Sequence, residues 1–142
     1  MTDFIHTRKL TVEWGHCDPA GIVFNSRFFE FFDWSTWLLF EAALGVNKHE
    51  LFNVFDIIGI PLVGAGARFL KPIKFGDVVE ISSNVSEFRR SSFDVQHRLS
   101  QQGELAVEGN ETRVWAGRKA DDPAEMKSKP IPAKVIARFK TS

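Results

Sequence analysis

The order of apolar and polar residues predicts a short strand, then a loop, then a long helix. Apolar and polar residues alternate over residues 8–14, which is typical of a strand. Gly residues and an Asp-Pro pair mark residues 15–21 as a loop. From Asn25 or Ser26 to Leu44, apolar side chains fall on nearly every helical face, which predicts a buried helix that Ser26 would cap.

The rest of the chain is predicted to be mainly β-structure. Residues 46–58 are compatible with a short second helix or with an irregular cover. Short turns then separate four segments of strand character, at residues 61–70, 77–88, 92–100 and 105–117. This order favours one α+β domain over residues 1–142, with an antiparallel sheet wrapped around the helix and a second copy covering what remains. A Pro-led helical turn is expected within residues 127–139.

Charge and cysteine content narrow the class of protein. The chain has 142 residues and a formal net charge of zero, which argues against a nucleic-acid partner. Its single cysteine, Cys17, excludes an intrachain disulfide and fits a reducing compartment. No signal peptide is recognisable, and charged residues interrupt the long apolar helix, so no membrane span is expected. These two observations predict a cytoplasmic protein. No residues have the spacing of zinc ligands, so no bound metal is expected.

Two carboxylates occupy positions that call for an explanation. Asp18 belongs to an Asp-Pro-Ala-Gly corner just before the apolar helix, and Asp33 lies among aromatic residues within that helix. Asp18 either fixes the turn or takes part in chemistry. Asp33 needs a partner or faces a cavity, because an unpaired buried charge is strongly destabilising. Three arginines are candidate partners for Asp33, namely Arg27, Arg68 and Arg113.

The corner and helix start, CDPAGIVFNSRFFEFFD (residues 17–33), resemble the 4-hydroxybenzoyl-CoA thioesterase family of the hot-dog fold. The similarity continues through GIPLVGAGARFLKPIKFGDVVEI (59–81) and EFRRSSF (87–93). The resemblance implies a five-stranded antiparallel sheet around one long central helix. It also implies acyl-CoA thioester hydrolysis at the interface of a homodimer, with dimers that associate into a tetramer.

In such an enzyme, Asp18 is the implied catalytic carboxylate, acting as a nucleophile or as a base that activates water. Thioester hydrolysis also needs donors for the carbonyl oxygen, and backbone amides at a helix start can supply them. The candidate amides are those of Val23, Phe24 and Asn25. Gly21 would let the backbone come close to the substrate.

The acyl group is expected to meet aromatic and acidic side chains. The hypothesis for Asp33 is a hydrogen bond to a ring hydroxyl of the substrate or to a polar group beside that hydroxyl. Four aromatic residues are candidates either for the wall of an aromatic pocket or for the core, namely Phe24, Phe28, Phe32 and Trp34. Gly64 and Gly66, within a predicted strand, mark a close approach by a substrate or by another backbone.

Basic residues are candidates for binding the phosphates of coenzyme A. Arg89 and Arg90, followed by Ser91, lie between two predicted strands, although a solvated turn would carry the same residues. Lys71 and Lys74 are further candidates. His97 falls on an apolar strand face and is predicted to be a core residue.

The sequence thus predicts hydrolysis of an aromatic acyl-CoA, of the 4-hydroxybenzoyl or benzoyl type, without a cofactor beyond the coenzyme A of the substrate. Such an activity would serve the degradation of aromatic compounds. Three alternatives stay open. They are a short-chain aliphatic acyl-CoA thioesterase of the same fold, a hydratase that would use His16, and a protein that binds acyl-CoA without turnover.

Overall fold

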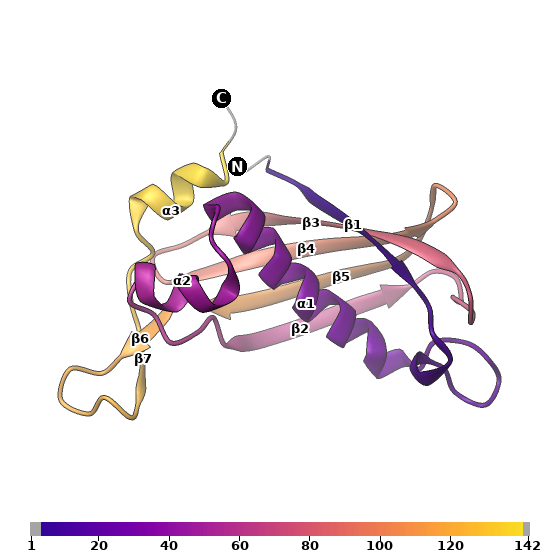
Figure 1. Cartoon of the computed structure of the whole chain (residues 1–142), viewed down its shortest axis with the longest axis horizontal. Coiled ribbons are helices and arrows are strands. Elements are labelled where there is room, and N and C mark those ends of the chain that lie inside the picture. The colour runs from indigo at the N-terminus through magenta and orange to yellow at the C-terminus, as the bar shows by residue number, and fades with distance from the viewer. Residues whose placement is uncertain (1–3, 141–142) are drawn as a thin grey trace.

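A computed structural model describes residues 4–140 of the chain. Five strands form one antiparallel sheet in the order β1-β3-β4-β5-β2, and the helix α1 lies across one face of this sheet (Figure 1). The bounds are β1 His6–Thr11, α1 Asn25–Leu44, β2 Leu62–Phe69, β3 Val78–Phe88, β4 Ser92–Gln101 and β5 Glu104–Val114. The predicted five-stranded α+β architecture around one long helix is therefore confirmed.

Smaller elements occupy the two ends of the sheet (Figure 1). A 3-10 turn, Trp14–His16, leads into the corner at one end. At the other end lie α2 (Lys48–Val54), α3 (Ala133–Arg138) and a projecting hairpin of β6 (Ala116–Arg118) and β7 (Met126–Ser128). Of the two alternatives for residues 46–58, the structure shows the short helix, α2. Asn47 and Glu50 form a capping box that stabilises its start.

Three local expectations are wrong. The first strand ends at Thr11, because Trp14 belongs to the 3-10 turn. The last predicted strand is two elements, since β5 ends at Val114 and a separate hairpin begins at Ala116. Ser26 does not cap α1, since the helix already begins at Asn25 and the N-cap is Phe24, whose backbone is extended.

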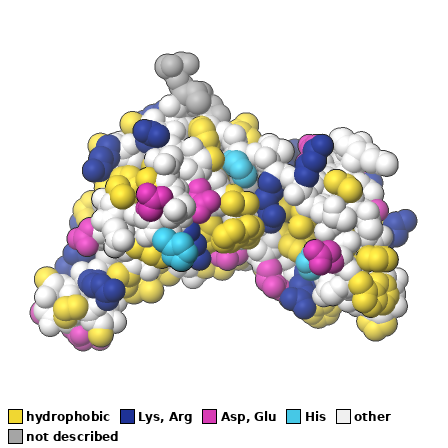
Figure 2. Space-filling model, viewed as in Figure 1, with side chains coloured by type: hydrophobic (Ala, Val, Ile, Leu, Met, Phe, Trp, Pro, Cys, Tyr) yellow, Lys and Arg dark blue, Asp and Glu magenta, His cyan; other side chains and the backbone are white. Residues whose placement is uncertain are grey.

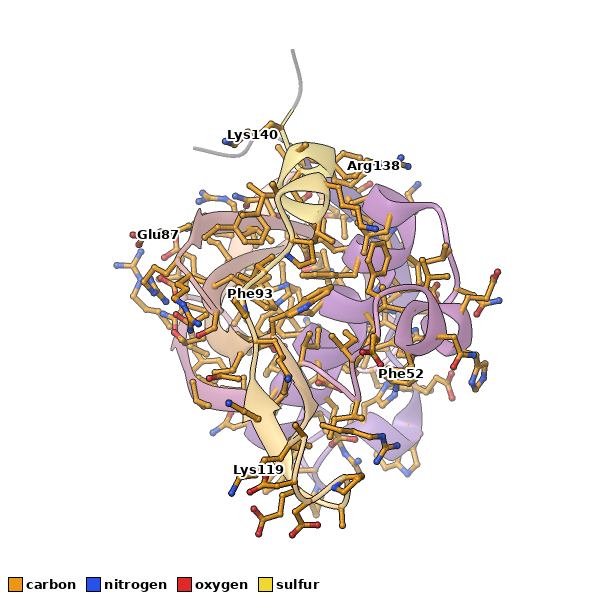
Figure 3. All side chains as sticks on the ribbon, turned by 90° about the vertical axis from the view of Figure 1, so that its left-hand side faces the viewer. Phe52, Glu87, Phe93, Lys119, Arg138 and Lys140 are labelled. Carbon is orange, nitrogen blue, oxygen red and sulfur yellow. The ribbon has the colours of Figure 1, made fainter. Side chains whose placement is uncertain are left out.

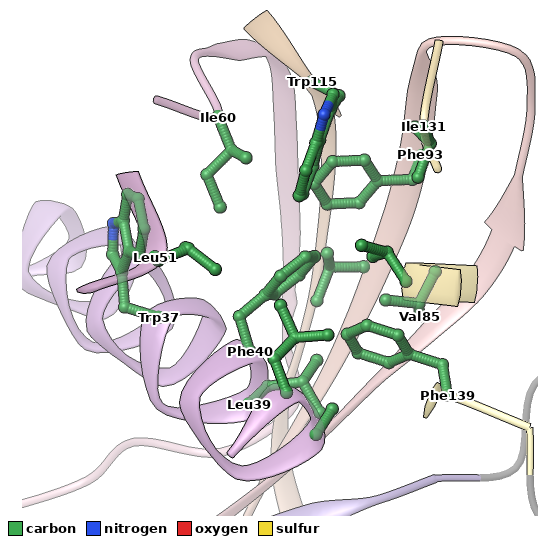
Figure 4. Close-up of a cluster of buried hydrophobic side chains, with 14 of the residues drawn as sticks. Trp37, Leu39, Phe40, Leu51, Ile60, Val85, Phe93, Trp115, Ile131 and Phe139 are labelled. Atoms are coloured by element: carbon green, nitrogen blue, oxygen red, sulfur yellow. The ribbon is translucent and has the colours of Figure 1, made fainter. Parts of the chain in front are cut away.

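The core lies between α1 and the sheet. Viewed from the end, the two layers enclose Phe93, whereas Glu87 points outward (Figure 3). The fully buried ring of Phe40 packs against Phe93 and Phe139, with centroids 5.2 Å and 4.9 Å apart, so α3 closes the end of the core (Figure 4). Burial of several aromatic side chains gives this end of the domain most of its stabilisation.

One side of α1 and the edge strand β2 remain uncovered. On α1, Phe29 and Trp34 are 37% and 45% exposed, so the helix is not buried on every face as predicted. Leu62 and Val63 on β2 are 48% and 62% exposed. Along β2 the molecular outline is recessed between the projecting hairpin and the corner (Figure 2). Within residues 4–140, no helix is long and apolar enough to cross a membrane.

Candidate active site

The corner before α1 is closed by backbone hydrogen bonds. The amide of Asp18 donates to the carbonyl of Ile22, and the amide of Gly21 donates to the carbonyl of Asp18, both at 2.9 Å. Gly21 has a φ of +81°, a left-handed conformation that a residue with a Cβ adopts only with strain. Gly21 therefore permits the turn, and its predicted role in a close approach to the substrate stays a prediction.

The side chain of Asp18 is only partly engaged. Its Oδ1 accepts a hydrogen bond from the amide of Ala20 at 2.8 Å, which is the turn-fixing role considered from the sequence. Its second oxygen has no hydrogen-bond partner among the residues that the structure describes. Asp18 is partly buried, and the turn holds one of its two carboxylate oxygens.

Only one of the three candidate amides is free to bind a substrate oxygen. The amide of Val23 donates to Ile73 at 2.8 Å, and that of Phe24 donates to His16 at 3.0 Å, so the expectation that these two amides are free is wrong. Asn25 is the first residue of α1, and its amide has no acceptor in the described part of the chain. An unpaired amide at the positive end of a helix is suited to a developing negative charge.

An apolar pocket of about 270 Å³ lies beside this helix start. Residues from the corner and the first turn of α1 form one side of the pocket. The end of β2 and the loop after it form the other side. The lining residues are Ile22, Val23, Asn25, Phe28, Phe69, Leu70, Lys71, Pro72 and Ile73. The pocket brings together four of the predicted site residues, which are Val23, Asn25, Phe28 and Lys71. Neither Asp18 nor Asp33 lines it.

Asp33 is paired with a buried arginine. Nη2 of Arg113 donates to Oδ1 of Asp33 at 2.7 Å, which identifies the partner among the three arginines considered. The Arg113 side chain is 3% exposed, whereas that of Asp33 is 55% exposed. No hydrogen bond occupies Oδ2 of Asp33 within residues 4–140. Asp33 is thus held through one oxygen and presents the other to solvent.

Arg113 is itself fixed by Glu111, two residues away on the face of β5 that packs against α1. Nε and Nη2 of Arg113 donate to the two carboxylate oxygens of Glu111 at 3.0 Å and 3.1 Å. Nη1 donates to the carbonyl of Ile60 at 3.0 Å. Burial acts to raise the pKa of Glu111, but hydrogen bonds from His97 and Arg113 outweigh it and lower that pKa to about 2.

His97 completes this buried polar cluster and is a core residue, as predicted. Its Nδ1 lies 2.7 Å from the hydroxyl of Ser83, and its Nε2 lies 3.1 Å from the hydroxyl of Thr36. The hydroxyl of Thr36 donates to Glu111. The sequence reasoning missed Glu111 and Thr36. The alternation of side chains along the strand could have identified Glu111, because Glu111 and Arg113 share a strand face with Val107 and Gly109.

Some predicted pocket residues lie elsewhere. Phe32 is 1% exposed and stacks on His97, so its proposed place in a substrate pocket is wrong. Phe24 and Trp34 are exposed side chains. Gly64 and Gly66 pair with Thr112 and Asn110 of β5, on the face opposite α1, and a Cβ at Gly66 would lie 3.0 Å from Oδ1 of Asn110. The close approach at Gly66 is made by a neighbouring side chain.

The basic residues divide between the two ends of the sheet. Arg89, Arg90 and Ser91 form the turn between β3 and β4, at the end opposite the corner. Arg89 pairs with Asp94 at 2.7 Å and with Glu87 at 3.1 Å, whereas Arg90 has no ion pair among the described residues. Lys71 and Lys74 lie at the corner end, where Lys71 pairs with Glu104.

Within residues 4–140, no group of three His, Cys, Asp or Glu side chains is arranged so that it could hold a metal ion. The corner and the pocket beside it supply a carboxylate, a backbone amide and an apolar wall. Such a set suits attack on a carbonyl carbon, since one group can attack or activate water while another stabilises the oxygen.

Comparisons with known proteins agree with this chemistry. Residues 12–139 match the thioesterase-like superfamily. The 4-hydroxybenzoyl-CoA thioesterase of Pseudomonas sp. strain CBS-3 is 27% identical over 135 residues, which cover 92% of this chain and 94% of that protein. Because the matched family region spans most of the domain, it includes both the corner and β5.

Two solved structures share the whole architecture. A mutant 4-hydroxybenzoyl CoA thioesterase complexed with 4-hydroxybenzoyl CoA superposes with a TM-score of 0.87 at 26% identity, covering 97% of this chain and 100% of that one. A gentisyl-coenzyme A thioesterase superposes with a TM-score of 0.80 at 30% identity, covering 94% and 99%. The chain belongs to the thioesterase-like superfamily and is a thioester hydrolase of the hot-dog fold.

Proposed function

We propose that this thioesterase hydrolyses an aromatic acyl-CoA, of the 4-hydroxybenzoyl or benzoyl type, to the free acid and coenzyme A. The observation that carries the proposal is the corner, where an unpartnered oxygen of Asp18 and the free amide of Asn25 lie beside an apolar pocket. The names of the relatives support the aromatic class, since both 4-hydroxybenzoyl and gentisyl groups are hydroxylated rings.

The reaction needs only groups of this chain and water. The Asn25 amide would bind the thioester oxygen as negative charge develops on it. The carboxylate of Asp18 would either attack the carbonyl carbon or take a proton from an attacking water. In the first route a carbon–oxygen bond forms, the carbon–sulfur bond breaks with loss of coenzyme A, and water then cleaves the anhydride. Both routes end in the same acid, and neither uses a cofactor.

The acyl ring would extend along α1. The pocket offers an apolar wall at the thioester end, with Phe28 and Phe69 as its aromatic side chains. Asp33 comes eight residues after Asn25, which corresponds to about 12 Å along a helix. A ring with a hydroxyl opposite the carbonyl, hydrogen-bonded at both ends, spans a comparable length. This supports a hydrogen bond from the ring hydroxyl to Asp33.

A homodimer would complete the site. β2 is an edge strand with an unpaired side and exposed Leu62 and Val63, a surface suited to pairing with another strand. Antiparallel pairing of β2 with β2 of a second copy would bring the turn 89–91 of the partner to the end of the joint sheet that carries Asp18. Within one chain, β3 separates that turn from the corner by roughly 33 Å, more than a pantetheine arm reaches.

In this arrangement Arg90, with Arg89 and Ser91, would bind the phosphates of a substrate whose thioester lies at the corner of the other copy. Further pairing of dimers would give a tetramer. The single cysteine is consistent with a cytoplasmic location, where such an enzyme would serve the degradation of aromatic compounds.

The test is release of free thiol from a panel of CoA thioesters, pairing 4-hydroxybenzoyl and benzoyl with acetyl, butyryl and hexanoyl. Each substrate is assayed with the wild type and with Asp18→Asn. Asparagine can still accept the hydrogen bond from Ala20, so the turn is kept while the carboxylate is lost. We expect strong aromatic turnover that falls by at least about 1,000-fold in Asp18→Asn, with binding of the thioester retained.

Two other results would redirect the proposal. Turnover confined to the aliphatic thioesters would contradict the aromatic assignment and favour a short-chain acyl-CoA thioesterase. Binding without turnover of any thioester would favour an acyl-CoA-binding protein.

A further inference from the structure

We infer that His16 is a positioning residue for thioester hydrolysis, and that it acts as a neutral imidazole whose Nδ1 accepts a main-chain hydrogen bond. The inference rests on the proposed function and deepens it, because it concerns what holds Asp18 and the amide of Asn25 in place. His16 lies two residues before Asp18, and no step of the proposed reaction uses its imidazole as an acid, a base or a nucleophile.

The imidazole of His16 completes the 3-10 turn that leads into the corner. The main-chain amide of Glu13 donates to Nδ1 of His16 at 3.0 Å. In return, the amide of His16 donates to the carbonyl of Glu13, also at 3.0 Å. Because a main-chain amide only donates, Nδ1 must offer a lone pair, which leaves the proton of the neutral ring on Nε2. A protonated imidazole carries a proton on both nitrogens, so it could not accept this hydrogen bond.

His16 thereby joins two fixed parts of the fold. Val12, one residue before Glu13, is 1% exposed and forms two main-chain hydrogen bonds with residues 76–77. On its other side, the ring of His16 meets the ring of Phe31 nearly at right angles, with centroids 5.0 Å apart. Phe31 is a buried residue of α1. The imidazole therefore links the end of β1 to the helix whose first residue supplies the proposed amide donor.

Both reactive groups of the corner depend on the position of His16. Its carbonyl accepts the amide of Phe24 at 3.0 Å, which fixes the residue just before α1. The backbone of Phe24 sets the direction of the next amide, that of Asn25. On the other side of the loop, Asp18 follows His16 by two residues. A shift of His16 would therefore disturb the alignment of the carboxylate with the amide, and a misplacement of about 1 Å can lower a rate by about 100-fold.

Three substitutions separate the hydrogen bond from the packing of the ring. His16→Phe keeps an aromatic ring against Phe31 and removes the acceptor. His16→Asn keeps an acceptor, since its amide oxygen can take the place of Nδ1, and removes most of the ring. His16→Ala removes both. His49→Phe is the matched control, because His49 is exposed and belongs to α2, at the end of the sheet opposite the corner (Figure 1).

The measurements are kcat and KM for 4-hydroxybenzoyl-CoA and benzoyl-CoA, with thermal melting of each variant. We expect His16→Phe to lower kcat by about 10- to 100-fold while KM stays within about threefold of the wild type. A loss confined to kcat is expected because the reacting groups lose their alignment whereas the pocket is kept. His16→Asn should recover most of the loss, His16→Ala should not, and His49→Phe should match the wild type.

Nitrogen-15 NMR of the histidine-labelled wild type tests the state of the ring without any change to the fold. We expect the signal of Nδ1 at the shift of an unprotonated ring nitrogen, and that of Nε2 at the shift of a protonated one. The signals of His16 are assigned by their absence from His16→Asn.

Three results would overturn the inference while the proposed function stands. They are a proton on Nδ1 of His16, a folded His16→Phe with the kcat of the wild type, and a folded His16→Asn that is no more active than His16→Phe. Absence of aromatic turnover in the wild type would instead overturn the proposed function, and the NMR measurement would still locate the proton of His16.

Discussion

The ring of Phe32 fills the space that a side chain at position 109 would occupy. A Cβ placed on Gly109 would lie 2.4 Å from Cε2 of Phe32, well inside van der Waals contact. Phe32 cannot simply withdraw, because it stacks on the buried His97 with ring centroids 4.8 Å apart. The contact between these two residues therefore sets how closely the middle of α1 approaches β5.

Gly109→Ala is accordingly expected to lower the free energy of unfolding by about 1–3 kcal/mol through overpacking. Urea unfolding measures the change. The control is Gly15→Ala, since a Cβ at Gly15 meets nothing within 4 Å and its φ is not positive. Adding Phe32→Leu to Gly109→Ala should recover part of the loss, and a Gly109→Ala protein as stable as the wild type would contradict the proposed contact.

The acid sensitivity of the fold should depend on Glu111. Its pKa is about 2 in the folded protein and 4.5 ordinarily, so its stabilising contribution is present above pH 4.5 and is lost as the pH falls toward 2. This contribution is on the order of 3 kcal/mol. Glu111→Gln should be less stable at pH 7 and should show a weaker loss of stability between pH 4.5 and 2. Urea unfolding at several pH values tests this.

A suitable control is Glu108→Gln on the opposite sheet face, which removes a partly exposed pair with Arg68 and should change stability by less than about 1 kcal/mol. Equal stability of Glu111→Gln and the wild type at pH 7 would mean that the buried cluster does not stabilise the fold.

The amide of Asn25 can be removed without removing the helix. Proline is favoured at the first position of a helix, and the extended backbone of Phe24, with φ −66° and ψ 132°, is compatible with a following proline. Asn25→Pro should therefore keep α1 while lowering kcat by about 100- to 1,000-fold, the usual effect of losing one oxyanion donor. Steady-state kinetics with circular dichroism tests both parts.

The matched variant Asn25→Ala removes the side chain and keeps the amide, so its kcat should stay within about tenfold of the wild type. Were Asn25→Pro to fold and retain full turnover, the carbonyl oxygen would have to be stabilised by another group.

Self-association should depend on the edge of β2. Lysine at an edge strand disfavours strand pairing, so Val63→Lys should weaken the dimer by at least about tenfold. Sedimentation velocity over a range of concentrations measures this. Val54→Lys is the control, because Val54 is similarly exposed at 55% but belongs to α2 and not to the edge strand. A wild type that sediments as a monomer would contradict the proposed dimer.

Local signals in the sequence were sufficient to predict the main elements. The alternation of apolar residues in β4 and the Gly-containing turn before β5 depend on neighbours along the chain, and the predicted strands agree with the structure there. The long apolar run gave α1 nearly correct bounds. The position of its N-cap was wrong because capping depended on the extended backbone of Phe24 and not on the nearest serine.

The site could be predicted only as far as it is local. Asp18 and Asn25 belong to one short segment, so their proximity followed from the chain. Whether the amide of Val23 is free depends on its pairing with the carbonyl of Ile73, which is a tertiary contact. Likewise, the sequence offered three arginines as partners of Asp33. Only the packing of β5 against α1 identifies Arg113 as the partner.

Main-chain hydrogen bonds within residues 16–24, together with others that join this segment to residues 73–75, hold the shape of the corner. Apart from Gly21 and Asp18, few side chains there are required for the turn. Positions such as Ala20 and Ile22 are therefore open to exchange, and the same reactive geometry can be retained while the surrounding surface diversifies. A library randomised at these positions would sample new substrate ranges on an unchanged scaffold, which makes the corner a natural starting point for directed evolution.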